Sequence, residues 1–290
     1  MTGTVTAIDT GFLQSRRRRR RRAPSAVVAA AFVIVALVVL CAIGGHWLAP
    51  YPAGKQDLVA TLQGPSGAHL LGTDDLGRDV FSRIIVGAAS ALTGPLVISL
   101  GAMVIGTLLG LLAGYRGGIV ETVIMRWVDL MYAVPQLLIA IVVVGVLDGS
   151  YWEAVLVLVV LTAPGDTRIM RGATIAQRSL PYVEALRVLG VPGPRILLRH
   201  IWPTLMPLTV AQTFLNFATS LVSLASLSFL GLGVAPGAAD WGRMLAEGRE
   251  LIATNPWTAV APGIAIALTA ASMNIVGDWL HERLTSGSNR

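Results

Sequence analysis

The sequence has little charge, one cysteine and one lysine. Only 13% of its 290 residues are charged and 54% are hydrophobic, whereas soluble domains carry about 25% charged residues. Too little polar material is present to cover a soluble globule of this size. The single cysteine, Cys41, leaves no internal disulfide and no multi-cysteine metal site.

Chemical motifs are also missing. The four histidines are scattered without metal-ligand spacing. Neither a phosphate-binding G-x-x-x-x-G-K-[ST] loop nor a G-x-S-x-G nucleophile motif occurs. The sequence therefore predicts no enzyme, no catalytic residues, no metal site and no cofactor bound by this chain.

The net positive charge of the chain comes from one short segment. Its net charge is +6, and Arg16 to Arg22 supply seven positive charges, so the remainder is close to neutral. A basic run beside an apolar stretch more often fixes membrane orientation or contacts anionic lipid than binds nucleic acid. We expect no nucleic-acid partner.

Long apolar runs dominate what is present. Residues 26–48 carry no charge over 23 positions, which gives a helix of about 34 Å. The run is too long for a signal-peptide core, so we interpret it as an uncleaved first span. The sequence predicts an all-α polytopic membrane protein with six transmembrane helices: 26–48, 92–113, 122–146, 154–174, 205–234 and 258–280.

Two of these spans carry interruptions. Pro135 should kink the third span. Pro164, Asp166 and Arg168 interrupt the fourth early, so it is the weakest of the six. Asp129 lies in the third span, and we expect an arginine such as Arg126 to pair with it.

Arginine placement predicts the orientation. With the N-terminus inside, 17 basic residues fall inside and five outside, as the positive-inside principle requires. Both termini should be cytoplasmic, and the seven tryptophans fall near predicted span ends, where headgroups favour them. The expected organisation is a basic tail (1–25), the first helix (26–48), an exterior segment (49–89), a five-helix core (90–280) with a cytoplasmic loop (175–204), and a tail (281–290).

The cytoplasmic loop should form a helical hairpin. Ser179 can cap a helix that ends at Gly190, and Pro194 can begin a second short helix that Pro203 closes. Apolar anchors are expected at Val183, Leu186, Leu189, Ile196 and Leu197. By composition alone, this would be a basic loop that only sets topology.

The exterior segment should contain an amphipathic helix after Asp75. Asp79 and Arg83 lie four residues apart and should pair, and Val80 and Ile85 lie on one apolar face. We expect this helix to lie on the outer leaflet.

Two periodic patterns occur within the spans. Ala102, Gly106, Gly110 and Gly114 recur every four residues, a spacing that lets helices pack closely. Hydroxyl and amide side chains recur along the fifth span and should face either other helices or an aqueous path. This stripe comprises Thr209, Gln212, Thr213, Asn216, Ser220, Ser223 and Ser226, with Thr219 as an alternative to Ser220.

The ordered residues of the loop resemble a known signature. Glu184, Ala185, Gly190, Ile201 and Pro203 resemble the EAA…G…I-x-LP loop of bacterial ABC-importer permeases, with Leu186 and Trp202 departing from it. HLLGTDDLGRDVFSR, residues 69–83, resembles H-x-LGTD-x-LGRD-x-xSR of the dipeptide/oligopeptide/nickel branch, whose "C" permease this chain looks like. LSFLGLGVAPGAADWG, residues 227–242, and NIVGD, residues 274–278, look like two further signatures of that branch.

The resemblance covers about residues 47–283 and implies a type I ABC importer permease in the bacterial inner membrane. Its implied partners are a second permease subunit, two ATPase subunits that use ATP and Mg, and an exterior substrate-binding protein. The loop would be the ATPase-coupling element, with Glu184, Ala185, Arg187, Gly190, Arg195, Ile201 and Pro203 as its site residues.

The implied cargo is a di- or oligopeptide, and nickel chelates or glutathione are alternatives. A stand-alone secondary transporter is disfavoured because no internal repeat and few midplane charges are visible.

Overall fold

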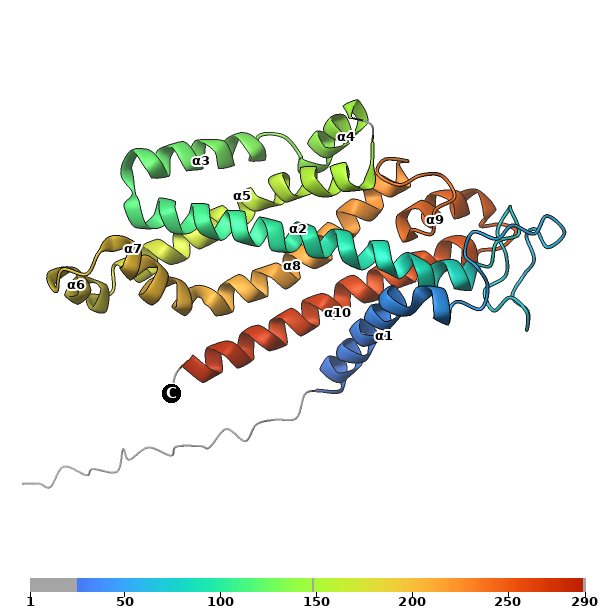
Figure 1. The fold of residues 1–290 in the computed structure, drawn as a ribbon, viewed down its shortest axis with the longest axis horizontal. Coiled ribbons are helices and arrows are strands. Elements are labelled where there is room, and N and C mark those ends of the chain that lie inside the picture. The colour runs from blue at the N-terminus through green and yellow to red at the C-terminus, as the bar shows by residue number, and fades with distance from the viewer. Residues whose placement is uncertain (1–24, 148, 289–290) are drawn as a thin grey trace, which may run out of the picture.

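The computed structural model describes residues 25–147 and 149–288 (Figure 1). Within them the regular structure is helical, apart from one isolated bridge between Thr73 and Asp79. The basic run at residues 16–22 lies outside the described residues. The elements are α1 (Ala26–Leu48), α2 (Val80–Arg116), α3 (Gly118–Tyr132), α4 (Gln136–Val146), α5 (Tyr151–Arg178), α6 (Pro181–Val188), α7 (Gly193–Ile196), a π-helical turn (Leu197–Ile201), α8 (Trp202–Phe229), α9 (Trp241–Gly248), a 3-10 turn (Arg249–Leu251) and α10 (Trp257–Ser288).

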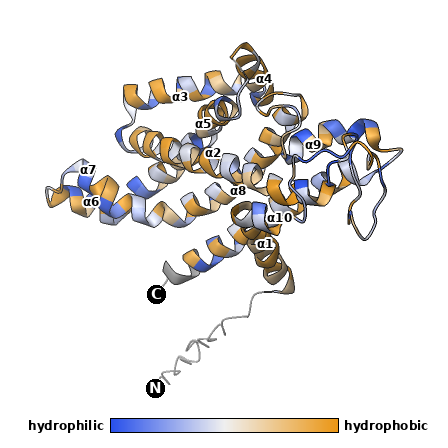
Figure 2. Cartoon of the chain, turned by 45° about the vertical axis from the view of Figure 1, so that its right-hand side comes forward, coloured by the Kyte–Doolittle hydropathy of each residue, from blue (hydrophilic) through white to orange (hydrophobic). Residues whose placement is uncertain are grey.

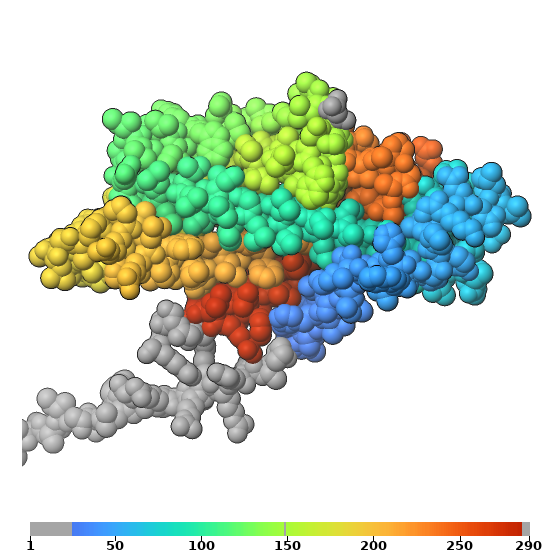
Figure 3. Space-filling view, viewed as in Figure 1, coloured from blue at the N-terminus to red at the C-terminus, as the bar shows by residue number. Residues whose placement is uncertain are grey.

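The long helices run along the longest dimension of the molecule (Figure 1). α2 packs along α5 and α8, α10 packs along α8, and α1 crosses α2 and α10. The space-filling view in Figure 3 shows that different segments project at the two ends. We call residues 179–203 the hairpin end, and residues 49–79 together with 231–256 the α9 end.

The apolar lengths suit a membrane protein. Four helical stretches are long and apolar enough to cross a bilayer, Ala26–Leu48, Val80–Arg116, Gly193–Phe229 and Trp257–Thr285, and the bent pair α3–α4 makes up to five. Figure 2 shows apolar colour over α1 and along α3 and α4, with polar colour gathered near α9 and α7. The predicted fourth span corresponds to α5, whose charged residues keep it outside this set, so the count of six stays a prediction.

The expected kink at Pro135 is confirmed and is a full break. α3 ends at Tyr132, α4 begins at Gln136, and the two helix axes differ by 83°. Proline supplies no backbone N–H and disfavours helical backbone in the residue before it. The third predicted span is therefore two helices.

The prediction of a separate surface helix before the second span is wrong. Both belong to α2, whose 37 residues reach about 55 Å, well beyond the roughly 30 Å hydrocarbon core. Asp79 caps its start by accepting from the backbone N–H of Ser82 at 2.7 Å. Val80 and Ala88 are buried within the protein, so this apolar face packs on other helices instead of lying on lipid.

The repeat of small residues on α2 is a helix contact. A Cβ added at Gly106 would lie 2.3 Å from Cβ of Asp166, one at Gly110 would lie 2.5 Å from Cβ of Met170, and the third glycine of the series meets α5 likewise. Real Cβ atoms do not approach so closely, so only glycine permits this spacing. The expected packing role is confirmed, and α2 and α5 form one closely fitted pair.

Candidate functional site

The hairpin end is two short helices joined by a closed turn. α6 stops at Val188, and Gly190 adopts φ of +73°. The N–H of Gly190 donates to Arg187 O at 2.9 Å, and the N–H of Val191 donates to Leu186 O at 3.0 Å. This pair of bonds is a Schellman motif, which uses a left-handed residue after the helix. The expected helix end at Gly190 is confirmed.

Two other details of the hairpin differ from expectation. Ser179 does not cap α6; its hydroxyl donates to Ala176 O in the preceding helix, and Leu180 with Pro181 starts α6 instead. Pro203 does not close the second arm. It lies in the first turn of α8, after a π-helical turn in which the N–H of Trp202 donates to Leu197 O.

This π-helical turn makes the second arm continuous with α8. Proline cannot donate to the carbonyl four residues earlier and crowds it, and a wider turn accommodates that defect. The residues from Gly193 to Phe229 therefore form one helical stretch without a break.

A small apolar cluster holds the hairpin to the bundle. Val183, Ile196 and Ile201 are fully buried and pack with residues of α2, α5 and α8. Leu186 and Leu197 contribute as expected, whereas Leu189 is 77% exposed and anchors nothing within the described chain.

Sequence reasoning missed Tyr115 at the C-terminal end of α2. Its carbonyl accepts from Arg178 Nη1 at 2.9 Å, and its ring lies 5.5 Å below the Arg187 guanidinium. A Cβ at Gly193 would come within 3.1 Å of the same ring. The aromatic near a Gly–Arg end of a long span was the available signal, but spacing alone gives no partner across 60 or more residues.

The outward face of the hairpin combines charge with exposed apolar side chains. Glu184, Ala185 and Arg195 are exposed, and Val188 at 83% is as open as its neighbour Leu189. Exposed apolar side chains rimmed by polar ones mark protein-contact surfaces more often than bare solvent. The predicted coupling residues therefore lie on one projecting element, with Ile201 and Pro203 at its base.

The polar stripe of α8 is divided between two environments. Thr209, Asn216 and Ser220 are buried inside the bundle, and Asn216 donates to Asp166 of α5 at 2.7 Å. Gln212, Thr213, Ser223 and Ser226 are partly exposed. The buried members therefore face other helices, and a role of the partly exposed ones in a path stays a prediction.

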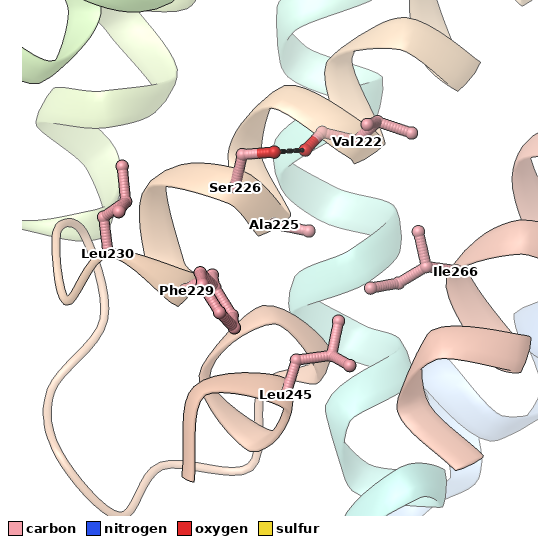
Figure 4. A pocket seen from close by; sticks show the side chains of 7 residues that line it. All are labelled: Val222, Ala225, Ser226, Phe229, Leu230, Leu245 and Ile266. Atoms are coloured by element: carbon pink, nitrogen blue, oxygen red, sulfur yellow. Dashed lines mark hydrogen bonds between the residues drawn. The ribbon is translucent and has the colours of Figure 1, made fainter. Parts of the chain in front are cut away.

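An open apolar groove lies beside the C-terminal half of α8. It has a volume of about 310 Å³ and is bounded by α8, Leu245 of α9 and Ile266 of α10 (Figure 4). The one hydroxyl in its wall, on Ser226, donates to Val222 O of its own helix at 2.8 Å. The groove therefore offers contact area and no free hydrogen-bonding group of its lining side chains.

Ion pairs join α3 to α5. Asp129 accepts from Arg168 Nη2 at 2.9 Å, so its partner is Arg168 and not Arg126 as expected. Glu121 pairs with Arg171. Two of the charged residues that interrupt α5, Arg168 and Arg171, thus pair with carboxylates of α3.

At the α9 end, two buried arginines share two carboxylates. Asp74 Oδ2 accepts from Arg78 Nε at 2.7 Å and from Arg83 Nη1 at 2.6 Å, and Glu247 Oε2 accepts from both at 3.1 and 3.0 Å. Both arginines are at most 3% exposed. The predicted pairing of Asp79 with Arg83 is wrong, because Asp79 faces His69 at 2.9 Å and caps α2.

These contacts explain the ordered charges of residues 69–83. Burial raises the pKa of Glu247, but Arg83, the backbone N–H of Gly237 and Arg78 outweigh that effect, so the pKa is lowered overall. Trp241, expected at the headgroup level, is buried and donates to Ile84 O at 2.9 Å. Through these contacts, residues 69–83 join the 49–79 loop and the start of α2 to α9.

Within residues 25–147 and 149–288, no three His, Cys, Asp or Glu side chains gather where they could hold a metal ion.

Comparison with known proteins agrees with this architecture. Residues 106–288 match the family described as binding-protein-dependent transport system inner membrane component. Residues 11–65 match the N-terminal transmembrane domain of oligopeptide transport permease C.

Individual relatives are similar over most of the chain. The chain is 39% identical over 249 residues to the glutathione transport system permease of Pectobacterium atrosepticum, covering 86% of this chain and 83% of that protein. It is 38% identical over 223 residues to the dipeptide transport system permease of Alkalihalophilus pseudofirmus, covering 77% and 73%. The di/tripeptide permease of Pseudomonas aeruginosa is 36% identical over 254 residues, covering 86% and 84%. The chain therefore belongs to the family of binding-protein-dependent transport permeases, as a multi-pass ABC-transporter subunit of the dipeptide/oligopeptide/nickel branch.

Proposed function

We propose that this chain forms half of the translocation pathway of an ATP-driven peptide importer in the cell membrane. A second permease subunit forms the other half, two ATPase subunits hydrolyse ATP with Mg, and an exterior binding protein delivers the cargo. This chain itself performs no covalent chemistry.

The hairpin end is the observation that carries this proposal. It projects beyond the helical bundle, exposes Val188, Leu189 and Glu184, and is joined at one side to α5 and at the other, through the π-helical turn, to α8. An ATPase that grips the hairpin therefore acts on two long helices at once. A loop that only sets topology would need neither the Schellman turn nor the buried anchors.

The test uses Glu184→Arg and Gly190→Val in the assembled transporter. Reversing the charge at Glu184 should weaken ATPase docking, and valine at Gly190 opposes the positive φ of the turn. Both variants should insert at parental levels but lose ATP-dependent uptake and cargo-stimulated ATP hydrolysis. Gly172→Ala is the control, because a Cβ there meets nothing within 4 Å. Normal uptake with the ATPases attached in both variants would remove the hairpin from coupling.

The proposed orientation places both termini and the hairpin in the cytoplasm. Reporter fusions after Pro65 and Gly237 should indicate the outside, and a fusion after Ser179 the inside. An inside signal at Pro65 would reverse the topology.

Peptide cargo is favoured by relatives named for dipeptide and di/tripeptide transport. Glutathione, itself a tripeptide, is the second candidate, because a relative named for it is 39% identical to this chain. Identifying the ligand that co-purifies with the cognate binding protein decides between them.

A further inference from the structure

Asp166 of α5 makes a buried contact that membrane packing alone does not require. It is 3% exposed, and its Oδ2 accepts from Nδ2 of Asn216, itself 6% exposed, at 2.7 Å. Gln212 then donates to Asn216 Oδ1 at 3.3 Å. Burying these polar groups in a bilayer-spanning bundle is costly, so an apolar pair of similar size would hold the helices more cheaply.

Asp166 is not part of the ion pairs around it. Arg168 pairs with Asp129, and Arg171 pairs with Glu121. Oδ1 of Asp166 is buried and has no hydrogen-bond partner among the described residues. Its defined interaction is therefore the hydrogen bond to α8, and that bond crosses 50 positions of the chain.

The contact lies where three helices meet. Gly106 of α2 lets Asp166 approach so closely that an added Cβ would lie 2.3 Å from the Asp166 Cβ. The glycine contacts fix α5 to α2. Elsewhere between α5 and α8, Thr209 Oγ1 lies 3.7 Å from the Met170 sulfur. A thioether is a weak acceptor. The Asp166–Asn216 bond is thus the main polar link from the α2–α5 pair to α8.

The same two helices carry the hairpin. α5 ends at Arg178, twelve residues after Asp166, and is followed by α6, while α7 continues through the π-helical turn into α8. The segment from Asp166 to Asn216 therefore forms a closed loop, with the hairpin at its tip and this hydrogen bond at its base. A displacement of the hairpin therefore acts directly on the Asp166–Asn216 hydrogen bond.

We infer that Asp166 is a positioning residue that ties α5 to α8, so that hairpin displacement moves both helices together. This inference rests on the proposed function. Without the tie, the ATPase subunits still turn over and still hold the hairpin, but α8 slips relative to α5 and the path is not driven.

The closing experiment measures cargo uptake and ATP hydrolysis on the same reconstituted transporter. Asp166→Ala should lower the uptake per ATP hydrolysed about ten-fold, a usual size for coupling between sites. Asp166→Asn keeps an acceptor for Asn216 and should restore most of the ratio. Thr167→Ala is the matched control, because the Thr167 hydroxyl is buried but donates within its own helix to Ala163 O.

A second measurement tests the contact without transport. The apparent Tm of the purified transporter is compared for the parent, Asp166→Ala, Asn216→Ala and the double variant. If the two side chains act as one unit, the double variant melts no lower than the worse single variant. Additive shifts would overturn the tie.

The outcomes separate the two claims. If the parent and Asp166→Ala give the same cargo uptake per ATP hydrolysed, this inference is overturned and the proposed function stands. A parent in which dipeptide-loaded binding protein stimulates no ATP hydrolysis overturns the proposed function, and the coupling role of Asp166 falls with it. A decline of uptake and hydrolysis in proportion, at an unchanged ratio, shows a merely structural residue and also overturns the inference.

Discussion

The two ends of the molecule are stabilised in different ways. At the α9 end, Asp74 and the partly exposed Glu247 neutralise the buried Arg78 and Arg83, and the Asn255 amide contacts three backbone carbonyls. The hairpin end relies on a few buried aliphatic residues and leaves large apolar side chains uncovered. The α9 end pairs its buried charges within the chain, although it too exposes apolar side chains such as Val59, whereas the hairpin end is held mainly by aliphatic packing.

This difference indicates which end is rigid within the chain. Buried charge networks demand defined geometry and are costly to open once one partner is lost. A hairpin held by apolar contacts and one turn motif can tilt as a unit while its helices persist. The predictions below test this contrast, from the largest expected loss of folding stability to the smallest.

Removing Asp74 should have the largest effect. Asp74→Ala leaves two buried arginines with half of their neutralising charge, and breaking such a pair costs about 3–5 kcal/mol. The measurement is thermal unfolding of the purified protein in detergent. Asp75→Ala is the control, because Asp75 is 53% exposed and lies 3.8 Å from Arg78. Equal melting of the two variants would contradict a rigid α9 end.

Asn255 should rank second. Its Nδ2 lies within 3.4 Å of carbonyls of Gln63, Leu71 and Thr73, and its side chain is fully buried. Asn255→Leu leaves the Leu71 and Thr73 carbonyls without this donor, whereas the Gln63 carbonyl keeps its bond from the Thr73 N–H; an unpaired buried group costs about 1–3 kcal/mol. Limited proteolysis of residues 49–79 should be faster in this variant. Thr254→Ala alters an exposed neighbour and should change neither the stability nor the proteolysis rate.

Acid should weaken the α9 end through Glu247. Its pKa is lowered in the folded protein, so its contribution to stability is complete above the unfolded pKa, about 4.3. It is lost as pH falls through the lower folded value. Melting of the parent should therefore decline below about pH 4.3, and Glu247→Gln should melt lower at neutral pH but show a shallower acid decline. Parallel curves for the two proteins would show that Glu247 does not carry this dependence.

Polar substitution at the hairpin tip should change folding stability least. Val188→Asp and Leu189→Asp alter exposed positions, so thermal unfolding should shift by less than about 0.5 kcal/mol. Co-purification of the ATPase subunits should nevertheless be lost, because a carboxylate would enter an apolar contact. Val183→Asp is the contrasting variant, since Val183 is fully buried and its replacement should destabilise the hairpin itself. Retained ATPase binding in both tip variants would show that the exposed face is not the docking surface.

Much of the helical outline was predictable because it depends on local composition. The uncharged run at residues 26–48 is α1, Pro135 breaks the third span, and Gly190 takes the positive φ expected after a helix. The glycine series on α2 likewise predicted a close helix contact, since small side chains at four-residue spacing leave a groove whatever fills it. These features follow from hydrophobicity, backbone restriction and side-chain size at nearby positions.

Pairings between distant residues were decided only by the tertiary structure. Sequence spacing joined Asp79 to Arg83 and Asp129 to Arg126, whereas the fold joins Arg83 to Asp74 and Glu247, and Asp129 to Arg168. It also merged the expected surface helix into α2 and continued the hairpin into α8 past Pro203. A charged side chain binds the opposite charge that tertiary packing brings nearest, and here that partner is not the one that sequence spacing suggests. The link between Asp166 and Asn216 belongs to this second class, because it exists only where three helices meet.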